Sequence, residues 1–167
     1  MKKIAILLCG LLMNASSVFA DSSRVDFNGT VQAIPCVVDG AASVDVDLGD
    51  IQASTLDTFY VSPYTSFQIK LKNCPAITSA TATFSGAFDP AYPGMYKNSG
   101  TATRTAIQVG NSDDSQFISS VRPSITKTVA ADHTVAFNLV ARAYSPTAQP
   151  SIPGTISAVL QVDFTYQ

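Results

Sequence analysis

The sequence contains few of the residues that carry out enzymatic chemistry. Its single histidine, His133, follows Asp132, but neighbours on a strand or turn point in different directions, so we do not expect a catalytic pair. No G-x-S-x-G motif supplies a nucleophile, and glutamate is absent. Asp113 and Asp114 indicate a polar turn, because a calcium loop needs more oxygen ligands at fixed spacing. We expect no enzymatic activity, no metal site and no cofactor.

Two cysteines are the most informative reactive residues. Cys9 lies in the N-terminal apolar stretch, so Cys36 and Cys74 remain once that stretch is removed. If the N-terminal apolar stretch directs export to an oxidising compartment, two remaining cysteines predict one disulfide. Two cysteines and one histidine do not complete a zinc site. Closing the long loop between the cysteines would stabilise the fold by roughly 4 kcal/mol on the chain-entropy model.

The N-terminus predicts a secretory signal peptide over residues 1–20. Lys2 and Lys3 precede an apolar stretch, and Val18-Phe19-Ala20 offers compact residues at the cleavage positions. The apolar stretch is too short to span a bilayer, and no other run approaches the roughly 20 apolar residues that a membrane helix needs. We therefore expect export, with no integral membrane segment.

Length and composition favour a single all-β domain. Removing 20 of the 167 residues leaves 147, which suits one domain with a sizeable core. The loss of two lysines moves the formal charge from −2 to −4, so a basic nucleic-acid-binding surface is not expected. Serine, threonine, valine and alanine dominate while glutamate is absent, which favours strands over helices.

The last fourteen residues contain the clearest strand pattern. Apolar side chains occupy every second position, while the positions between them are mostly polar. This alternation predicts a long, half-buried strand that ends at Gln167. No residues follow to cover its flank, so the identity of whatever pairs with that edge becomes the main functional question. The apolar positions are Ile156, Ala158, Leu160, Val162, Phe164 and Tyr166.

Similar alternation recurs along the chain, and Pro, Gly, Asn and Asp separate the segments, which is typical of a β-sandwich. A short helical turn is expected at 51–56 and a surface loop at 88–100. The predicted strands are 25–38, 44–48, 66–72, 80–85, 105–109, 127–129, 134–144 and 155–166.

The stretch before Cys36 is the second informative feature. Val25, Phe27, Gly29 and Val31 share one face of a predicted strand. Gly29 would leave a notch on that face, or room for another backbone. Two interpretations stay open on periodicity alone: an ordinary first strand of the same sandwich, or a strand that pairs elsewhere.

Short motifs across the chain resemble those of pilus subunits assembled by the chaperone–usher pathway, specifically the minor subunits of type 1 pili. The C-terminal segment carries the most specific resemblance. These pilins have a glycine fourteenth from the C-terminus and an aromatic residue second from it, and here these are Gly154 and Tyr166. The other motifs are Gly29-Thr30-Val31 before Cys36-Val37-Val38, then Val46-Asp47-Leu48-Gly49, Leu71-Lys72-Asn73-Cys74-Pro75 and Phe84-Ser85-Gly86.

The resemblance implies an incomplete immunoglobulin-like β-sandwich, the pilin fold, over residues 34–167, with an N-terminal donor strand over 21–33. The sandwich lacks its last strand, so a periplasmic chaperone first occupies the groove and holds the terminal carboxylate. At the outer-membrane usher, the N-terminal extension of a neighbouring pilus subunit replaces the chaperone. The implied location is the fimbria at the cell surface. The implied donor side chains are Val25, Phe27, Gly29 and Val31, and the implied groove residues are Gly154, Ile156, Leu160, Val162, Phe164, Tyr166 and Gln167.

The resemblance predicts a structural subunit in cell adhesion, in particular a minor tip adaptor, while terminator and shaft positions stay open. A lectin-like carbohydrate-binding module is the alternative, because β-sandwiches often bind ligands through their loops. Tyr92, Met95 and Tyr96 could stack on a sugar in that case.

Overall fold

The computed structural model describes residues 24, 26–30, 34–145 and 150–167, and the chain divides into two units, residues 1–31 and 32–167. In the first unit, the described residues form no helix or strand. Of the strand predicted over 25–38, Val37–Val38 form a strand, the described residues 26–30 and 34–36 do not, and residues 25 and 31–33 lie outside the described residues. A strand is defined by pairing, and no partner strand is assigned to the described residues 26–30.

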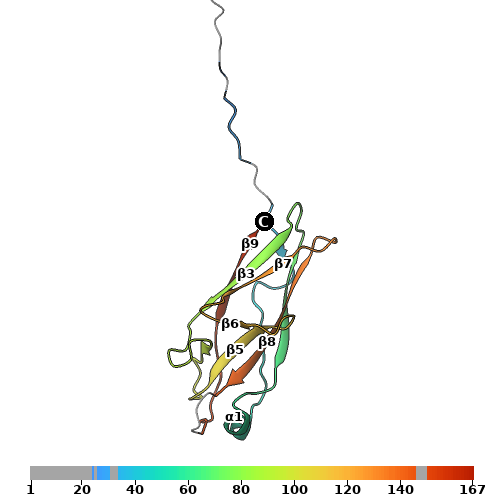
Figure 1. Ribbon diagram of the computed structural model, residues 1–167. Helices are drawn as coiled ribbons and strands as arrows, with labels where there is room; N and C mark the ends of the chain where they lie inside the picture. Colours follow the sequence, from blue (N-terminus) through green and yellow to red (C-terminus); the bar gives the residue numbers. More distant parts are fainter. Residues whose placement is uncertain (1–23, 25, 31–33, 146–149) are drawn as a thin grey trace, which may run out of the picture. The chain divides into compact units, whose positions relative to one another are not determined.

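The second unit contains two antiparallel sheets, shown in Figure 1. In the larger sheet the strand order is β1-β2-β8-β5-β4, and β6 also pairs with β5. Its strands are β1 (Val37–Val38), β2 (Thr65–Lys72), β4 (Tyr96–Lys97), β5 (Ala106–Asn111), β6 (Phe117–Ile118) and β8 (Val135–Tyr144).

The smaller sheet has three strands in the order β7-β3-β9, so β9 lies at its edge. These are β7 (Ser124–Thr128), β3 (Ser79–Gly86) and β9 (Leu160–Tyr166). Helix α1 (Ala53–Phe59) follows the first strand and ends at Tyr60, which adopts a left-handed conformation. The expected helical turn at 51–56 is thus a two-turn helix that begins and ends slightly later.

The core lies between the two sheets and is built from the alternating side chains of the central strands. Leu71 of β2, with Phe137 and Leu139 of β8, is fully buried. From the smaller sheet, Ala82 and Phe84 of β3 complete this cluster. The observed architecture is the all-β sandwich that the alternation predicts.

Two local predictions were wrong. No strand is assigned over 44–48, although Val46 and Leu48 still pack against the core. The alternation there identified the side chains that face inward, but these residues do not form strand hydrogen bonds. The expected surface loop over 88–100 contains β4, and Tyr96 within it is only 1% exposed. The Tyr96 ring stacks on Phe88 at 4.9 Å between centroids, so this turn-rich segment is anchored in the core.

The disulfide forms between Cys36 and Cys74, as the cysteine count predicts, with the Cα atoms 4.4 Å apart. Both residues belong to the buried core. The Cys74 N–H donates to the carbonyl of His133 at 3.1 Å. The disulfide and this hydrogen bond together connect Cys36, near the start of the domain, to the turn before β8. Among the described residues, no helix has the length and apolar character needed to cross a membrane.

Candidate functional site

Strand β9 is less well covered than β8, the central strand of the other sheet. Its inward side chains Leu160, Val162, Phe164 and Tyr166 pack against the core but remain partly exposed. The inward side chains of β8, by contrast, are all buried. Since both strands have the same alternation, the difference lies in what covers them. The inward side chains of β9 are therefore only partly covered.

The free edge of β9 can be located from the hydrogen bonds at its end. Gln167 and Ser79 exchange both backbone hydrogen bonds, at 3.0 and 3.1 Å. In an antiparallel ladder the direction of these groups alternates, so Asp163 and Thr165 also face β3. The backbone groups of the even-numbered residues therefore point away from β3. In the described part of the chain, no strand pairs with that edge.

The predicted strand over 155–166 is assigned only from Leu160 onward. Thr155 and Ser157 instead bind the loop over 98–102, where Ala102 N–H donates to the Thr155 carbonyl at 3.0 Å. These odd-numbered residues direct their backbone groups to the same side as those that bind β3. Ile156 and Ala158 are partly buried and continue the inward face.

Gly154 lies where two backbones cross. A Cβ atom at this position would stand 2.6 Å from the carbonyl carbon of Thr101 and equally close to its hydroxyl oxygen. Among the predicted groove residues, Gly154 thus has a distinct environment: it lets the chain pass the loop at the start of the C-terminal run.

At the other end of the run, Phe164 packs on Phe137 with 5.8 Å between ring centroids. The Tyr166 hydroxyl donates to the carbonyl of Cys36 at 3.5 Å, and burial raises the pKa of Tyr166. An oxygen of Gln167 accepts hydrogen bonds from the N–H groups of Thr78 and Ser79 at 2.7 and 3.1 Å. The end of β9 is therefore firmly attached to the start of β3.

The predicted donor residues are described only in part. Phe27 is 92% exposed, and nothing lies within 4 Å of a Cβ built on Gly29. Val25 and Val31 lie outside the described residues. The Phe27 side chain is thus an apolar surface that stands exposed among the described residues 26–30.

Sequence reasoning missed the loop over 98–102, and Asn98 in particular, as part of this site. The side-chain amide of Asn98 binds Ser157 and Thr155. The sequence signal was slight: an Asn-Ser-Gly turn, followed by threonine, in a segment without alternation.

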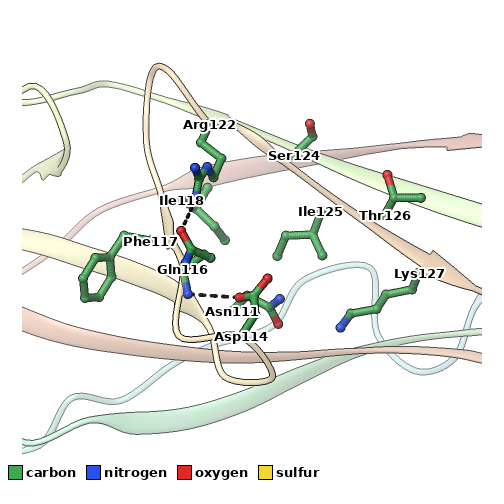
Figure 2. A pocket seen from close by; sticks show the side chains of 10 residues that line it. All are labelled: Asn111, Asp114, Gln116, Phe117, Ile118, Arg122, Ser124, Ile125, Thr126 and Lys127. Carbon is green, nitrogen blue, oxygen red and sulfur yellow. Dashed lines mark hydrogen bonds between the residues drawn. The ribbon is translucent and has the colours of Figure 1, made fainter.

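A second concave surface lies beside β6 and β7, shown in Figure 2. It is a cleft of about 280 Å³ whose wall includes Asp114, Gln116, Arg122 and Lys127. Arg122 donates a hydrogen bond to the Gln116 side chain, and the Gln116 N–H donates to Asp114 at 3.0 Å. Hydrogen bonds thus join Asp114, Gln116 and Arg122 along the wall of the cleft, while Lys127 binds Asp113.

The acidic residues considered for chemistry have structural partners. Thr134 donates its hydroxyl to Asp132 at 2.7 Å, and this bond is the main reason that the pKa of Asp132 is lowered. Asp113 accepts from Lys127 at 2.6 Å and from Asn138 at 3.0 Å, which lowers its pKa in the same way. Nowhere in the described ranges do three histidine, cysteine or acidic side chains gather as metal ligands would.

The aromatic loop of the lectin alternative does not present all of its rings. Tyr96 is buried and its hydroxyl has no hydrogen-bond partner in the described structure, while burial raises its pKa to about 12. A ring in this position cannot stack on a sugar, so the lectin alternative loses one of its three proposed contact residues.

Comparison with known proteins identifies the family. The family model described as "Fimbrial protein" matches residues 25–167. Similar proteins include FimG of Escherichia coli K12, 35% identical over 99% of this chain and 97% of FimG. The S-fimbrial adhesin protein SfaS of Escherichia coli O6:K15:H31 is 34% identical over 99% of both chains.

Solved structures share the fold. The P pilus rod subunit PapA superposes with a TM-score of 0.64 at 24% identity, covering 86% of this chain and all of PapA. A subunit of a chaperone–usher pilus gives a TM-score of 0.67 at 24% identity over 92% of this chain. The sandwich is thus the immunoglobulin-like pilin fold. The chain belongs to the fimbrial protein family: it is a structural pilus subunit, exported through the periplasm to the cell surface, and not an enzyme.

Proposed function

We propose that this subunit polymerises by donor-strand exchange: the free edge of β9 accepts a β-strand from another molecule, and residues 21–33 supply a strand to a neighbour. One observation carries the proposal. The inward side chains of β9 are only partly buried along an edge to which no strand is assigned in the described part of the chain. A strand added there would satisfy the backbone groups and cover the core together.

The donor segment has the chemistry that such an edge requires. Phe27 is 92% exposed and lies on the same predicted face as Gly29. Burial of a side chain of this kind contributes roughly 1.5–3 kcal/mol. Alternating apolar side chains also fix the register, because a slip by one residue would direct them to the wrong face. Such head-to-tail contacts do not close on themselves and therefore generate a filament.

The domain boundaries and the assembly partners follow from the same proposal. Residues 1–20 form the signal peptide, 21–33 the donor extension and 34–167 the pilin domain. A periplasmic chaperone covers the β9 edge before assembly, because an exposed apolar edge strand invites aggregation. The outer-membrane usher is then the place of exchange. We assign the subunit to a minor, tip-adaptor position, on its resemblance to the minor subunits of type 1 pili.

A peptide assay tests the proposal without altering the fold of the subunit. The chain from residue 21 is refolded with an excess of a synthetic peptide that carries residues 21–33, and the monomeric complex is isolated by size-exclusion chromatography. A peptide with Phe27→Asp places a charge on the apolar face, and a peptide with Asn28→Asp places the same charge on the opposite face.

We expect the unaltered and Asn28→Asp peptides to give a monomeric complex, and the Phe27→Asp peptide to leave the chain aggregated. The proposal is contradicted by equal capture of all three peptides, or by a chain that is monomeric and resistant to proteolysis with no peptide present. In the second case the sandwich is complete by itself.

A further inference from the structure

The loop over 98–102 binds the start of the C-terminal run through one side chain. The Asn98 side-chain oxygen accepts hydrogen bonds from the N–H groups of Gly100 and Ser157, both at 2.9 Å. Its amide nitrogen donates to the carbonyls of Ala102 at 2.8 Å and Thr155 at 3.4 Å. Two donors meet the oxygen and two acceptors meet the nitrogen, so the full capacity of the amide nitrogen is used.

The same contact is reinforced by the backbone and by two threonines. Ser99 N–H donates to the Ser157 carbonyl at 2.8 Å. The Thr101 N–H donates to the Thr155 hydroxyl at 3.0 Å, and the Thr155 N–H donates to the Thr101 hydroxyl at 2.8 Å. Thr155 and Ser157 thereby have both their N–H and carbonyl groups bound, although β3 does not reach them.

Close approach of the two backbones depends on glycine on both sides. A Cβ on Gly100 would stand 2.6 Å from the Thr155 carbonyl carbon, and a Cβ on Gly154 would meet Thr101 at the same distance. Real Cβ atoms do not come this close to backbone, so any larger residue would push the loop and the run apart.

The contact with the loop over 98–102 affects how far the free edge of β9 extends toward Ile156. The ladder between β3 and β9 ends at the pair Gly86 and Leu160. Beyond that pair, Ile156 and Ala158 pack against the core as the inward side chains of β9 do. Since Thr155 and Ser157 bind the loop over 98–102, we infer from the alternation of an extended chain that the backbone groups of Ile156 and Ala158 point to the free side, as those of Val162 do. Hydrogen bonds from the loop over 98–102 to Thr155 and Ser157, together with core packing of Ile156 and Ala158, hold this segment in place.

We propose that Asn98 is a positioning residue for strand acceptance: it aligns residues 155–158 with β9, so that a donated strand meets one continuous edge from Ile156 to Tyr166. This inference rests on the proposed function. Asn98 does not itself contact the donated strand in this account; it acts through Thr155 and Ser157.

Amide hydrogen exchange of the peptide-complemented chain tests the inference residue by residue. The complex with the 21–33 peptide is prepared for the unaltered chain, Asn98→Ala, Asn98→Asp and Asn138→Ala. Asn138 is a matched control, because its side chain also makes hydrogen bonds to two partners, Gln68 and Asp113, but lies in β8. The N–H groups of Ile156, Ala158, Val162 and Phe164 report on pairing with the donated strand.

We expect all four amides to be protected in the unaltered complex and in Asn138→Ala. In Asn98→Ala, exchange at Ile156 and Ala158 should be at least tenfold faster, while Val162 and Phe164 stay within about threefold of the unaltered complex. Asn98→Asp keeps the acceptor for Ser157 and should lie between the two.

The possible failures are distinguishable. If the unaltered complex protects none of the four amides, strand addition at this edge is contradicted and the proposed function fails with it. If the unaltered complex protects all four but Asn98→Ala leaves Ile156 and Ala158 unchanged, only the role of Asn98 is contradicted. The same holds if Asn98→Ala accelerates all four amides by an equal factor, since that is a general loss of stability.

Discussion

The hydroxyl of Tyr166 lies 3.5 Å from the carbonyl oxygen of Cys36 and donates a hydrogen bond to it. Cys36 in turn is bonded to Cys74, so the last strand and the disulfide meet at one end of the sandwich. The chain that leaves Cys36 carries Val46 and Leu48, which pack on the same core as β9. This contact therefore ties the last strand to the segment that begins the domain.

Removal of the disulfide should destabilise the domain strongly. The bond connects residues 38 positions apart, and closing a loop of that length stabilises by roughly 4 kcal/mol on the chain-entropy model. We expect the Cys36→Ser, Cys74→Ser double variant to lose about this much in urea unfolding of the peptide complex, a large share of the stability of a small domain. An unchanged unfolding midpoint would contradict the prediction.

Stability should fall at high pH because of Tyr96. Burial raises the pKa of Tyr96 in the folded protein to about 12, whereas an unfolded tyrosine titrates near 10. The unfolded state releases its proton first, so the contribution of Tyr96 is complete below pH 10 and is lost as the pH rises through about 12. Urea unfolding of the complex at pH 9 and pH 11.5 measures this loss.

Tyr96→Phe isolates that effect. The buried hydroxyl has no hydrogen-bond partner in the described structure, so its removal should be neutral or slightly stabilising at pH 7. It should also reduce the loss between pH 9 and pH 11.5 by about 1–2 kcal/mol. Tyr64→Phe is the matched control, because its ring is 47% exposed. An equal loss in all three proteins would contradict the assignment to Tyr96.

Phe27→Asp in the whole chain should separate folding from assembly. Phe27 is 92% exposed and precedes residues 34–167, the proposed pilin domain, so we expect its replacement to leave the folding of that domain unchanged. We expect the variant to bind a chaperone and to accept a donor peptide as the unaltered chain does, yet to be absent from pili purified from cells that express it. Asn28→Asp should be incorporated normally. Incorporation of both variants at equal levels would count against residues 21–33 as the donor.

Two phenylalanines in contact should respond differently to truncation. Phe137 is fully buried, so Phe137→Ala should cost about 3–5 kcal/mol with or without a donor peptide. Phe164, 5.8 Å from Phe137 between ring centroids, is only partly buried, and under the proposed function a donated strand would cover it. Phe164→Ala should therefore also weaken peptide binding by at least tenfold in a fluorescence titration. Unaltered peptide affinity would mean that the donor does not cover Phe164.

The alternation of apolar and polar residues predicted which side chains face the core better than it predicted which backbone segments pair as strands. Val46 and Leu48 face the core as expected, yet no strand is assigned to them, because a side-chain pattern does not specify a backbone partner. Tyr96 was placed on the surface because proline and glycine surround it. Its ring is instead part of the buried core and stacks on Phe88, and these contacts cannot be read from the turn-forming residues around it.

Of the candidate site, the inward residues of β9 could be predicted from the sequence, whereas the loop over 98–102 could not. The inward positions of β9 could be read from the sequence because period 2 leaves a clear trace. The loop that binds Thr155 and Ser157 could not, since Asn98 acts from a segment without periodicity and 57 to 59 positions away. Gly154 was noted for its position in the sequence, whereas the structure gives the physical reason, its close contact with Thr101.

The most direct test of strand acceptance is an isotope-filtered nuclear Overhauser experiment on the ¹³C,¹⁵N-labelled chain in complex with the unlabelled 21–33 peptide. Strand acceptance at β9 predicts contacts between the peptide phenylalanine and the Val162 and Phe164 side chains, together with cross-strand contacts to their N–H groups. It is contradicted if the peptide makes no contact with β9, or if the labelled chain alone is monomeric and its own Phe27 gives those same contacts.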